Sequence, residues 1–398
     1  MIFCCVGAFP VPLIQVPDTL VALGDLAAAR RRGFTGPVVG LTGSTGKTTT
    51  KDMVAEILAL TGPGLKTEGN FNNLVGLPLT LFRLQPDHLW AVLEMGMSAR
   101  GEIARLTEIA APSVGVVTNV GPAHLDTLQN IEGVLRAKGE LFAAMKPGGI
   151  AVVNADDQRV AQLPVANGVR RICFGLSAEA QVRAENIIVT GRAITFDLLL
   201  PSSRHSVRLA VAGRHNVYNA LAAAATAHAL EVDGELIRRG LEAFRPAPGR
   251  MEVVAIKQDI LILEDSYNAN PLSVKAALAT LDELGGEGRR IAVLGDMLEL
   301  GQTSDELHRD IGLAAGRRVD MLILLGRMAE AVAIGAREAG LDAACIIQVN
   351  SHEEAVAYLR SRLQCGDHVL VKGSRAMHME KISGALRDED IPLAAGNC

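Results

Sequence analysis

Residues 40–50 of the chain read GLTGSTGKTTT, a glycine-rich turn between an apolar strand-length segment and an amphipathic helix-length segment. In such a turn, successive backbone N–H groups and the positive end of the following helix bind phosphate oxygens. Lys47 then reaches the terminal phosphates of a nucleotide, and the Thr48 hydroxyl ligates Mg²⁺. The spacing is one residue longer than the usual pattern, and an ordinary strand–turn–helix junction is the alternative. The glycines, the lysine and the hydroxyl residues together nevertheless favour binding of a nucleoside triphosphate.

The composition limits the class of protein. The chain has 398 residues, of which 49% are hydrophobic and 21% charged, with 40 glycines and few aromatic residues. This length predicts two or three domains, and the composition is typical of α/β proteins. The net charge of −5 argues against a broad basic surface for nucleic acid. We interpret the short run Arg30–Arg32 as a solvated helix end.

Cysteine usage and hydropathy indicate a cytoplasmic protein. The six cysteines are scattered without CxxC pairs, which favours reduced thiols over disulfides or a zinc site. No run approaches about 18 apolar residues, so we expect no membrane span. The apolar residues 1–16 lack a basic start and contain Pro10 and Pro12. We therefore interpret them as a strand or loop at a domain edge rather than as a signal peptide.

The order of segments predicts an α/β fold. Residues 1–35 end in a helix at Thr19–Arg32 and are too few for an independent domain. From residue 36, apolar strand-length segments alternate with helix-length segments, which predicts a mostly parallel sheet with helices on both faces. Between Ala180 and Gly213 the period changes to two, so we expect a small antiparallel layer there. The first predicted strands are Val38–Thr42, Trp90–Glu94, Val114–Asn119 and Ile150–Asn154.

A linker divides the rest of the chain. Two helices, Asn219–Leu230 and Gly234–Phe244, precede residues 245–249, in which two prolines and a glycine cannot continue a helix. Beyond the linker, strands and helices alternate again, as in a Rossmann-like doubly wound sheet. The later predicted strands are Ile260–Glu264, Arg290–Leu294, Met321–Leu325, Cys345–Val349 and His368–Val371. The predicted domains are residues 1–35, 36–248 and 249–398.

Polar residues follow the predicted strands of the central domain. Glu94 ends a strand and can complete a Mg²⁺ shell begun by Thr48, although a glutamate there is more often a solvated terminus. His124 lies in a loop after Val114–Asn119, at the edge where ligands bind in open α/β sheets. Lys138 by itself is more often a solvent-facing helix charge.

Other candidate residues lie in amide-rich or charged segments. The amides of TEGNFNN (Thr67–Asn73) suit a peptide or sugar ligand, or equally satisfy their own backbone in a turn. Asn219 suits a purine edge, whereas Asn216 is a helix-cap candidate. In the last domain, Arg250 and Asp265 at strand or linker edges suit a domain that closes on the nucleotide.

Taken together, these motifs resemble the Mur ligases, ATP-dependent amide-bond-forming enzymes of cytoplasmic peptidoglycan synthesis. The resemblance covers about residues 36–382. The motifs TEGNFNN, DSYNANP and LGDMLELG are typical of the family members that join D-alanyl-D-alanine to UDP-N-acetylmuramoyl-tripeptide. The other matching motifs are the phosphate loop, LEMGM, TNVGPAHL, AKGELF, GRHNVYNALAA and VKGSRAM.

The resemblance implies a reaction and its cofactors. A substrate carboxylate attacks the γ-phosphate of ATP, giving an acyl phosphate and ADP, and the amine of D-Ala-D-Ala then displaces phosphate. Thr48 and Glu94 would hold one Mg²⁺, and His124 would help to hold a second. In the family, the lysine that matches Lys138 is carbamylated by CO₂ and supports that metal, which replaces our solvent-facing interpretation. Lys47, Glu94, His124 and Lys138 are thus the predicted catalytic residues.

The resemblance also assigns the remaining candidates. Asn219 would face adenine, Arg250 the γ-phosphate and Asp265 the ribose. The predicted residues for the ATP phosphates are Gly43, Ser44, Thr45, Gly46, Lys47, Thr48 and Thr49. The predicted residues for the peptide substrates are Asn70, Asn72, Asn73, Asn268, Asn270, Lys372, Ser374 and Arg375.

One departure concerns the start of the chain. The family has an N-terminal domain that grips the UDP end of the precursor, and residues 1–35 resemble only its tail. We therefore expect a recorded start that is internal to a longer gene, and a weakened grip on uridine. We also expect a monomer. The alternatives are another Mur-type or folylpolyglutamate-type ligase, and an ATP-binding form without turnover.

Overall fold

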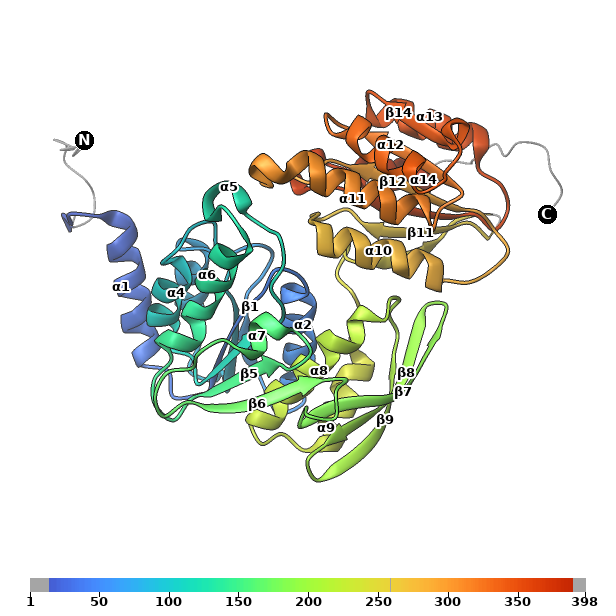
Figure 1. Cartoon of the computed structure of the whole chain (residues 1–398). Coiled ribbons are helices and arrows are strands. Elements are labelled where there is room, and N and C mark those ends of the chain that lie inside the picture. The colour runs from blue at the N-terminus through green and yellow to red at the C-terminus, as the bar shows by residue number, and fades with distance from the viewer. Residues whose placement is uncertain (1–13, 258, 389–398) are drawn as a thin grey trace.

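The computed structural model describes residues 14–257 and 259–388, which build two sheets, one in each of two α/β lobes (Figure 1). The interpretation of residues 1–16 falls almost wholly outside this range. The first lobe has β1 (Val38–Thr42), β2 (Gly64–Lys66), β3 (Trp90–Glu94), β4 (Val114–Val117), β5 (Ile150–Asn154), β6 (Arg170–Gly175), β7 (Val182–Thr190), β8 (Ala193–Leu200) and β9 (Ser203–Leu209). Its helices are α1 (Thr19–Arg32), α2 (Lys47–Ala59), α3 (Gly76–Phe82), α4 (Glu102–Ala110), α5 (Leu125–Leu128), α6 (Ile131–Ala144), α7 (Gln158–Ala161), α8 (His215–Ala229) and α9 (Gly234–Ala243).

The first sheet has the strand order β2-β3-β1-β4-β5-β6-β7-β8-β9 and is parallel from β2 to β6. Leu41 in β1 is level with Glu94 in β3, and Thr42 with Val117 in β4. Parallel strands end at the same edge of a sheet. The phosphate loop, Glu94 and the loop after β4 therefore share one edge, as the strand pattern predicted.

Alternate residues of the strands face two different helix layers. In β1, Val39 packs in a core with α2, α8 and α9, and Val38 packs in the core that contains α4 and α6. The alanine-rich sequence of α8 has a structural role here, because small side chains let it approach both α2 and the sheet. Both faces of the parallel part are covered, which explains its uniformly apolar strands.

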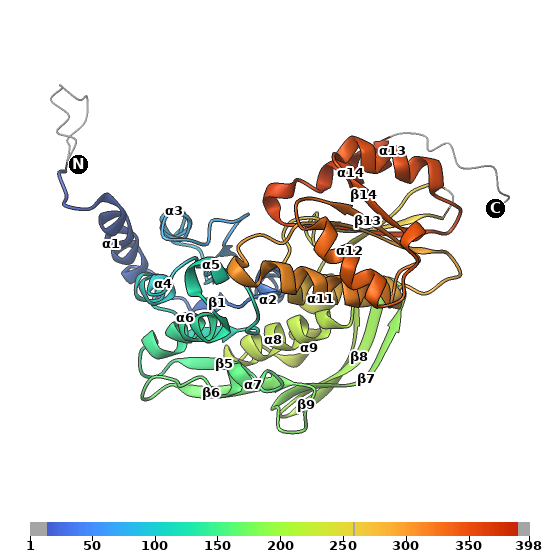
Figure 2. The same ribbon diagram turned by 45° about the horizontal axis from the view of Figure 1, so that its top comes forward.

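The predicted antiparallel strands form, and they continue the first sheet. β7, β8 and β9 pair antiparallel with one another. β7 joins β6 through Phe174 with Val182 and Gly175 with Arg183. The small antiparallel layer is thus an extension of the first sheet, and α8 and α9 pack against one face of its strands (Figure 2).

The second lobe is a doubly wound sheet of order β10-β11-β15-β12-β13-β14, parallel except for β10. Helices α10–α12 cover one face and α13–α14 the other. Its strands are β10 (Glu252–Ala255), β11 (Leu261–Asp265), β12 (Arg290–Gly295), β13 (Met321–Leu325), β14 (Ile346–Val349) and β15 (His368–Lys372). Its helices are α10 (Pro271–Glu283), α11 (Ser304–Gly316), α12 (Ala329–Glu338), α13 (His352–Arg362) and α14 (Glu380–Asp388), with short 3₁₀ turns η1 (Gly301–Thr303), η2 (Ala343–Cys345) and η3 (Arg375–Met377).

The arginine run ends α1 as expected, with Arg30 and Arg32 exposed, but two of its side chains also contact neighbouring helices. Arg31 Nε donates to the carbonyl of Ala110 (2.8 Å), and Nη2 donates to that of Ala111 (3.2 Å). Arg30 donates to the carbonyl of Leu84. A helix end leaves its last carbonyls without partners, and cations are favourable there. The arginines therefore attach α1 to the ends of α3 and α4.

The sequence led us to expect neither a membrane span nor disulfides. Within 14–257 and 259–388, no helix is long and apolar enough to cross a membrane. Cys173, Cys345 and Cys365, the cysteines in these ranges, form no disulfide with one another.

Candidate active site

The phosphate loop follows β1 directly and is held from behind by side chains. Gly46 adopts a φ of 77°, and a Cβ placed there would lie 2.2 Å from Asn219 Oδ1. Only glycine fits this position, because it combines a left-handed backbone with a close neighbour. Thr45 N–H donates to Asn119 Oδ1 (2.9 Å), and Lys47 Nζ donates to the Gly43 carbonyl (2.7 Å). The lysine thus lies across the loop whose phosphates it would contact.

Thr48 and Glu94 meet beside this loop. Thr48 Oγ1 donates to Glu94 Oε2 at 2.8 Å, and Asn72 Nδ2 donates to Glu94 Oε1 at 2.8 Å. Glu94 N–H donates to Thr67 Oγ1, which fixes the end of β3. Glu94 is buried, so it is not a solvated strand terminus. A hydroxyl and a carboxylate side by side are the hard oxygen ligands that Mg²⁺ takes together with water and phosphate oxygens.

Lys138 points from α6 into the same cavity. It is only 2% exposed, and among the described residues no hydrogen bond or ion pair to its Nζ is found. Burial lowers the pKa of Lys138 well below its ordinary value, and the nearby Lys47 lowers it further. Burial also lowers the pKa of Lys47, which Glu94 raises and Arg250 lowers. The solvent-facing interpretation of Lys138 from the sequence alone was wrong, because α6 turns this position inward.

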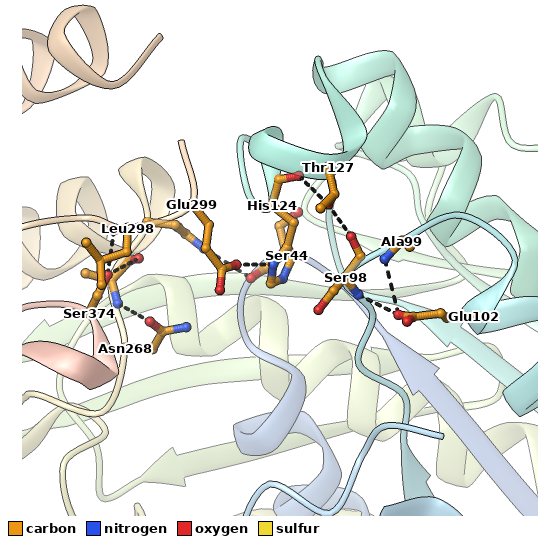
Figure 3. A network of polar contacts seen from close by, with 12 residues as sticks. Ser44, Ser98, Ala99, Glu102, His124, Thr127, Asn268, Leu298, Glu299 and Ser374 are labelled. Atoms are coloured by element: carbon orange, nitrogen blue, oxygen red, sulfur yellow. Dashed lines mark hydrogen bonds and ion pairs between the residues drawn. The ribbon is translucent and has the colours of Figure 1, made fainter. Parts of the chain in front are cut away.

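His124 lies at the lobe boundary. Its Nδ1 is 2.5 Å from Glu299 Oε2 of the second lobe (Figure 3). The Leu125 N–H donates to the Glu299 carbonyl at 2.8 Å. The hydrogen bond from His124 lowers the pKa of the Glu299 carboxyl. His124 also lines the cavity that contains Lys138 and Glu94.

The second lobe contributes a charged edge formed by β11 and β15. Asp265 and Lys372 are level in the parallel register and form an ion pair, and Lys372 Nζ also donates to the Asn268 carbonyl (2.9 Å). The Arg250 guanidinium lies over the Tyr267 ring, 3.9 Å from its centroid. Arg375 lies 5.8 Å from the same ring and pairs with Glu380. Asp265 and Lys372 are therefore held by each other.

One cavity of about 470 Å³ collects most of the predicted site residues from both lobes, a volume within the usual range for ligand pockets. The predicted residues that line it are Ser44, Thr45, Gly46, Lys47, Thr48, Thr49, Asn70, Asn72, Asn73, Glu94, His124, Lys138, Arg250, Asp265, Asn268, Asn270, Lys372 and Arg375. Three predicted residues, Gly43, Asn219 and Ser374, do not line it.

The residues outside the cavity lining have other partners. Asn219 lies behind the phosphate loop and donates from Nδ2 to Asn216 Oδ1 at 2.9 Å. Asn216 does not cap its helix, since its Nδ2 donates to the Ala212 carbonyl. Ser374 is buried and accepts the Leu298 N–H at 2.8 Å.

Two amides of the cavity also have local roles. Asn73 Oδ1 accepts the N–H groups of Val75 and Gly76, as the turn alternative predicted. Asn270 caps α10 and also donates from Nδ2 to the Ser44 carbonyl at 3.2 Å. This second contact crosses from one lobe to the phosphate loop of the other.

Several residues of the site were not predicted from the sequence, and three of them carry polar side chains that matter for its chemistry. His215 and Tyr267 line the cavity, and Glu299 contacts His124. Burial lowers the pKa of His215 to about 4, while Asp265 raises it and Lys372 lowers it. All three lie inside motifs already quoted, GRHNVYNALAA, DSYNANP and LGDMLELG, and for the first two an aromatic ring beside amides was the available signal.

A divalent metal fits part of this site. Thr48 and Glu94 offer one hydroxyl and one carboxylate, and the phosphates of a nucleotide would supply further oxygens. Within the described ranges, no group of three or more His, Cys, Asp and Glu side chains is placed to hold a metal ion alone. The residues present therefore suit a metal that arrives with the nucleotide.

The fold and the site define a class: a nucleotide-binding enzyme in which a phosphate-loop lobe and a doubly wound lobe share one cavity. The chain belongs to the Mur ligase family. The model of the Mur ligase middle domain matches residues 41–227, and that of the Mur ligase, glutamate ligase domain matches residues 249–375.

Individual relatives show which members of the family the chain is similar to. The chain is 37% identical over 386 residues to the UDP-N-acetylmuramoyl-tripeptide–D-alanyl-D-alanine ligase of Escherichia coli (strain K12), covering 95% of this chain and 82% of that protein. The crystal structure of MurF from Acinetobacter baumannii superposes with a TM-score of 0.88 at 36% identity, and the match covers 94% of this chain and 82% of that chain. MurF ligase from Thermotoga maritima in complex with ADP gives a TM-score of 0.84 at 29% identity, and the match covers 94% of this chain and 85% of that chain.

Proposed function

We propose that this chain is an ATP-dependent ligase that joins D-alanyl-D-alanine to UDP-N-acetylmuramoyl-tripeptide, a step of peptidoglycan precursor and cell wall synthesis. The products are the amide, ADP and phosphate. The observation that carries the proposal is the single cavity in which the phosphate loop, Glu94 and Lys138 face Arg250 of the second lobe. Relatives named for this reaction match nearly the whole chain.

The chain's own residues supply most of the electrostatic requirement. Phosphoryl transfer needs positioning and neutralisation of charge more than covalent chemistry. Backbone N–H groups of the loop and Lys47 hold the β- and γ-phosphates, and Arg250 approaches the γ-phosphate from the other lobe. Thr48 and Glu94 would hold Mg²⁺, which would supply further neutralisation of charge on the phosphates when bound. Lys47 and Arg250 lessen the repulsion between the γ-phosphate and the attacking carboxylate of the tripeptide.

Lys138 has a second proposed role, as the carbamate. Burial of Lys138 strongly lowers the pKa of its amine and so raises the share of the neutral form, which is the form that adds to CO₂. The resulting carbamate, formed with release of one proton, would turn an unpartnered base into an oxygen ligand. With His124, it would support a second Mg²⁺ near the acceptor carboxylate.

The other candidate residues are proposed to bind the substrates or the nucleotide, and binding experiments with variants test these roles. Asn70, Asn72 and Asn73 would face the tripeptide, and the residues proposed to meet the substrates from the second lobe are Asn268, Asn270, Lys372, Ser374 and Arg375. Asp265 would bind the ribose. Asn219 would face adenine. Because Asn219 lies behind the phosphate loop, this role requires the adenine to reach that side of the loop. We further propose a monomer that acts in the cytoplasm, divided into residues 1–35, 36–248 and 249–398.

A coupled assay tests the proposed function. Phosphate release should require ATP, UDP-N-acetylmuramoyl-tripeptide and D-Ala-D-Ala together, and Lys47→Met should abolish it. Exposed Lys146 offers a matched control, since Lys146→Met should leave the rate unchanged. Release with a different amino acid or a folate substrate, and none with D-Ala-D-Ala, would identify another ligase of the family. ATP binding without product at any substrate concentration would identify a form without turnover.

A further inference from the structure

Glu299 joins the second lobe to the loop that carries His124. It lies in the loop after β12, and its side chain is 59% exposed, so core packing does not explain its position. Its Oε2 lies 2.5 Å from His124 Nδ1. Its carbonyl accepts the N–H groups of Leu125 (2.8 Å) and Asp126 (3.4 Å). One residue therefore contacts the loop through both its side chain and its backbone.

Both members of this pair have strained backbones. Glu299 has a φ of 63° and His124 a φ of 55°, the left-handed region that costs a non-glycine residue about 1 kcal/mol. Such conformations persist only where their surroundings hold them, and they concentrate at functional sites. Here two of them face each other across the lobe boundary.

The hydrogen bond decides which nitrogen of His124 is available. A carboxylate can only accept, so in the neutral ring Nδ1 carries the proton and the lone pair lies on Nε2. His124 lines the cavity, and no described side chain or backbone group forms a hydrogen bond with Nε2. A carboxylate behind a histidine in this way orients the ring as a metal ligand.

The loop of Glu299 is itself anchored in the second lobe. Leu298 N–H donates to Ser374 Oγ (2.8 Å), and Ser374 N–H donates to the Asp296 carbonyl (3.0 Å). Figure 3 shows the resulting series of contacts from Ser374 through Leu298 and Glu299 to His124. The carboxylate therefore moves with the second lobe.

We propose that Glu299 is a positioning residue, whose carboxylate docks on His124 when the second lobe closes and presents Nε2 to the second Mg²⁺. This inference rests on the proposed function for the presence of that ion. Because Glu299 is anchored in the second lobe, it reaches His124 only when that lobe docks on the first. Docking of the lobes and binding of the second ion are therefore linked, and each favours the other.

Manganese binding tests the proposal without turnover. Mn²⁺ is titrated into the full chain with a non-hydrolysable ATP analogue, and free Mn²⁺ is measured by electron paramagnetic resonance. The wild type should bind two ions, and Glu299→Gln should weaken the second about 10- to 100-fold while leaving the first unchanged. Glu306→Gln is the matched control, because Glu306 is an exposed carboxylate in the first turn of α11. It should bind both ions as the wild type does.

The protonated nitrogen of His124 can be measured directly, and a general loss of stability would not change it. In ¹⁵N-histidine spectra, with His124→Gln to assign the signal, wild-type His124 should be protonated at Nδ1. Glu299→Gln should shift it toward protonation at Nε2. A single Mn²⁺ in the wild type, or an unchanged tautomer and unchanged second-ion affinity in Glu299→Gln, would overturn the inference. A chain that shows both effects yet makes no product would overturn the proposed ligase reaction instead.

Discussion

The Nζ atom of Lys138 faces a cavity that also contains the Lys47 ammonium, and no described residue neutralises it. Burying an unpaired charge is costly, so burial lowers the pKa of this amine and favours its neutral form. The neighbouring Lys51 is equally buried but stays partnered, through the Thr67 carbonyl and Asp52. The difference between these two lysines lies in their partners.

Lys138 should therefore take up CO₂ selectively. With ¹³C-bicarbonate at pH 7.5, we expect a carbamate signal in the carbon NMR spectrum of the wild type and none in Lys138→Gln. Ligase activity should fall in CO₂-depleted buffer and return when bicarbonate is added. Lys146→Gln removes an exposed lysine and should keep the signal. A signal that persists in Lys138→Gln would place the carbamate elsewhere.

His215 should make stability depend on pH. Its pKa is about 4 in the fold and about 6.5 in the unfolded chain. The folded state holds the neutral form, so its contribution is complete above about pH 6.5 and is lost as pH falls toward 4. The full loss is at most about 3 kcal/mol. The thermal midpoint should fall less between pH 7 and pH 5 in His215→Gln than in wild type. His378→Asn, at an exposed histidine, should keep the wild-type dependence.

At the scale of elements, the turn from β1 into α2 depends on one glycine. Gly46→Ala would combine a φ of 77° with a Cβ 2.2 Å from Asn219 Oδ1. Gly148 has a φ of 86° and no atom within 4 Å of the place where a Cβ would lie, so Gly148→Ala carries the backbone cost alone. Calorimetry with an ATP analogue should show at least about tenfold weaker binding for Gly46→Ala, since the loop must shift. Gly148→Ala should lose about 1 kcal/mol of stability and bind normally.

The sequence predicted these elements well where local rules decide them. The bounds of α1, β1, β3, β5 and β13 agree with the prediction, because apolar runs and turn residues mark both ends. β4 is shorter than predicted, since Thr118 and Asn119 turn back to contact the phosphate loop. The roles of Arg30 and Arg31 were not predictable, because their carbonyl partners lie about 50 to 80 residues away.

At the scale of the whole molecule, docking of the second lobe should protect the loop around His124. The N–H groups of Leu125 and Asp126 donate to the Glu299 carbonyl, a bond that opens when the lobes separate. Hydrogen exchange at these two residues should slow when an ATP analogue and both substrates are added. Helix α13, on the far face of the second sheet, should exchange at the same rate with and without ligands. Equal exchange at Leu125 in both conditions would argue against ligand-linked closure.

The sequence by itself determined the phosphate loop, the parallel sheet that supports it and the second α/β lobe, because each depends on local spacing and periodicity. It also placed Glu94 beside Thr48, since parallel strands end together. Only the tertiary structure decided that Lys138 is buried without a partner and that Asp265 neutralises Lys372. It alone joined Glu299 to His124, 175 residues away. These are contacts between distant segments, and their energies depend on burial and distance, which local sequence patterns do not encode.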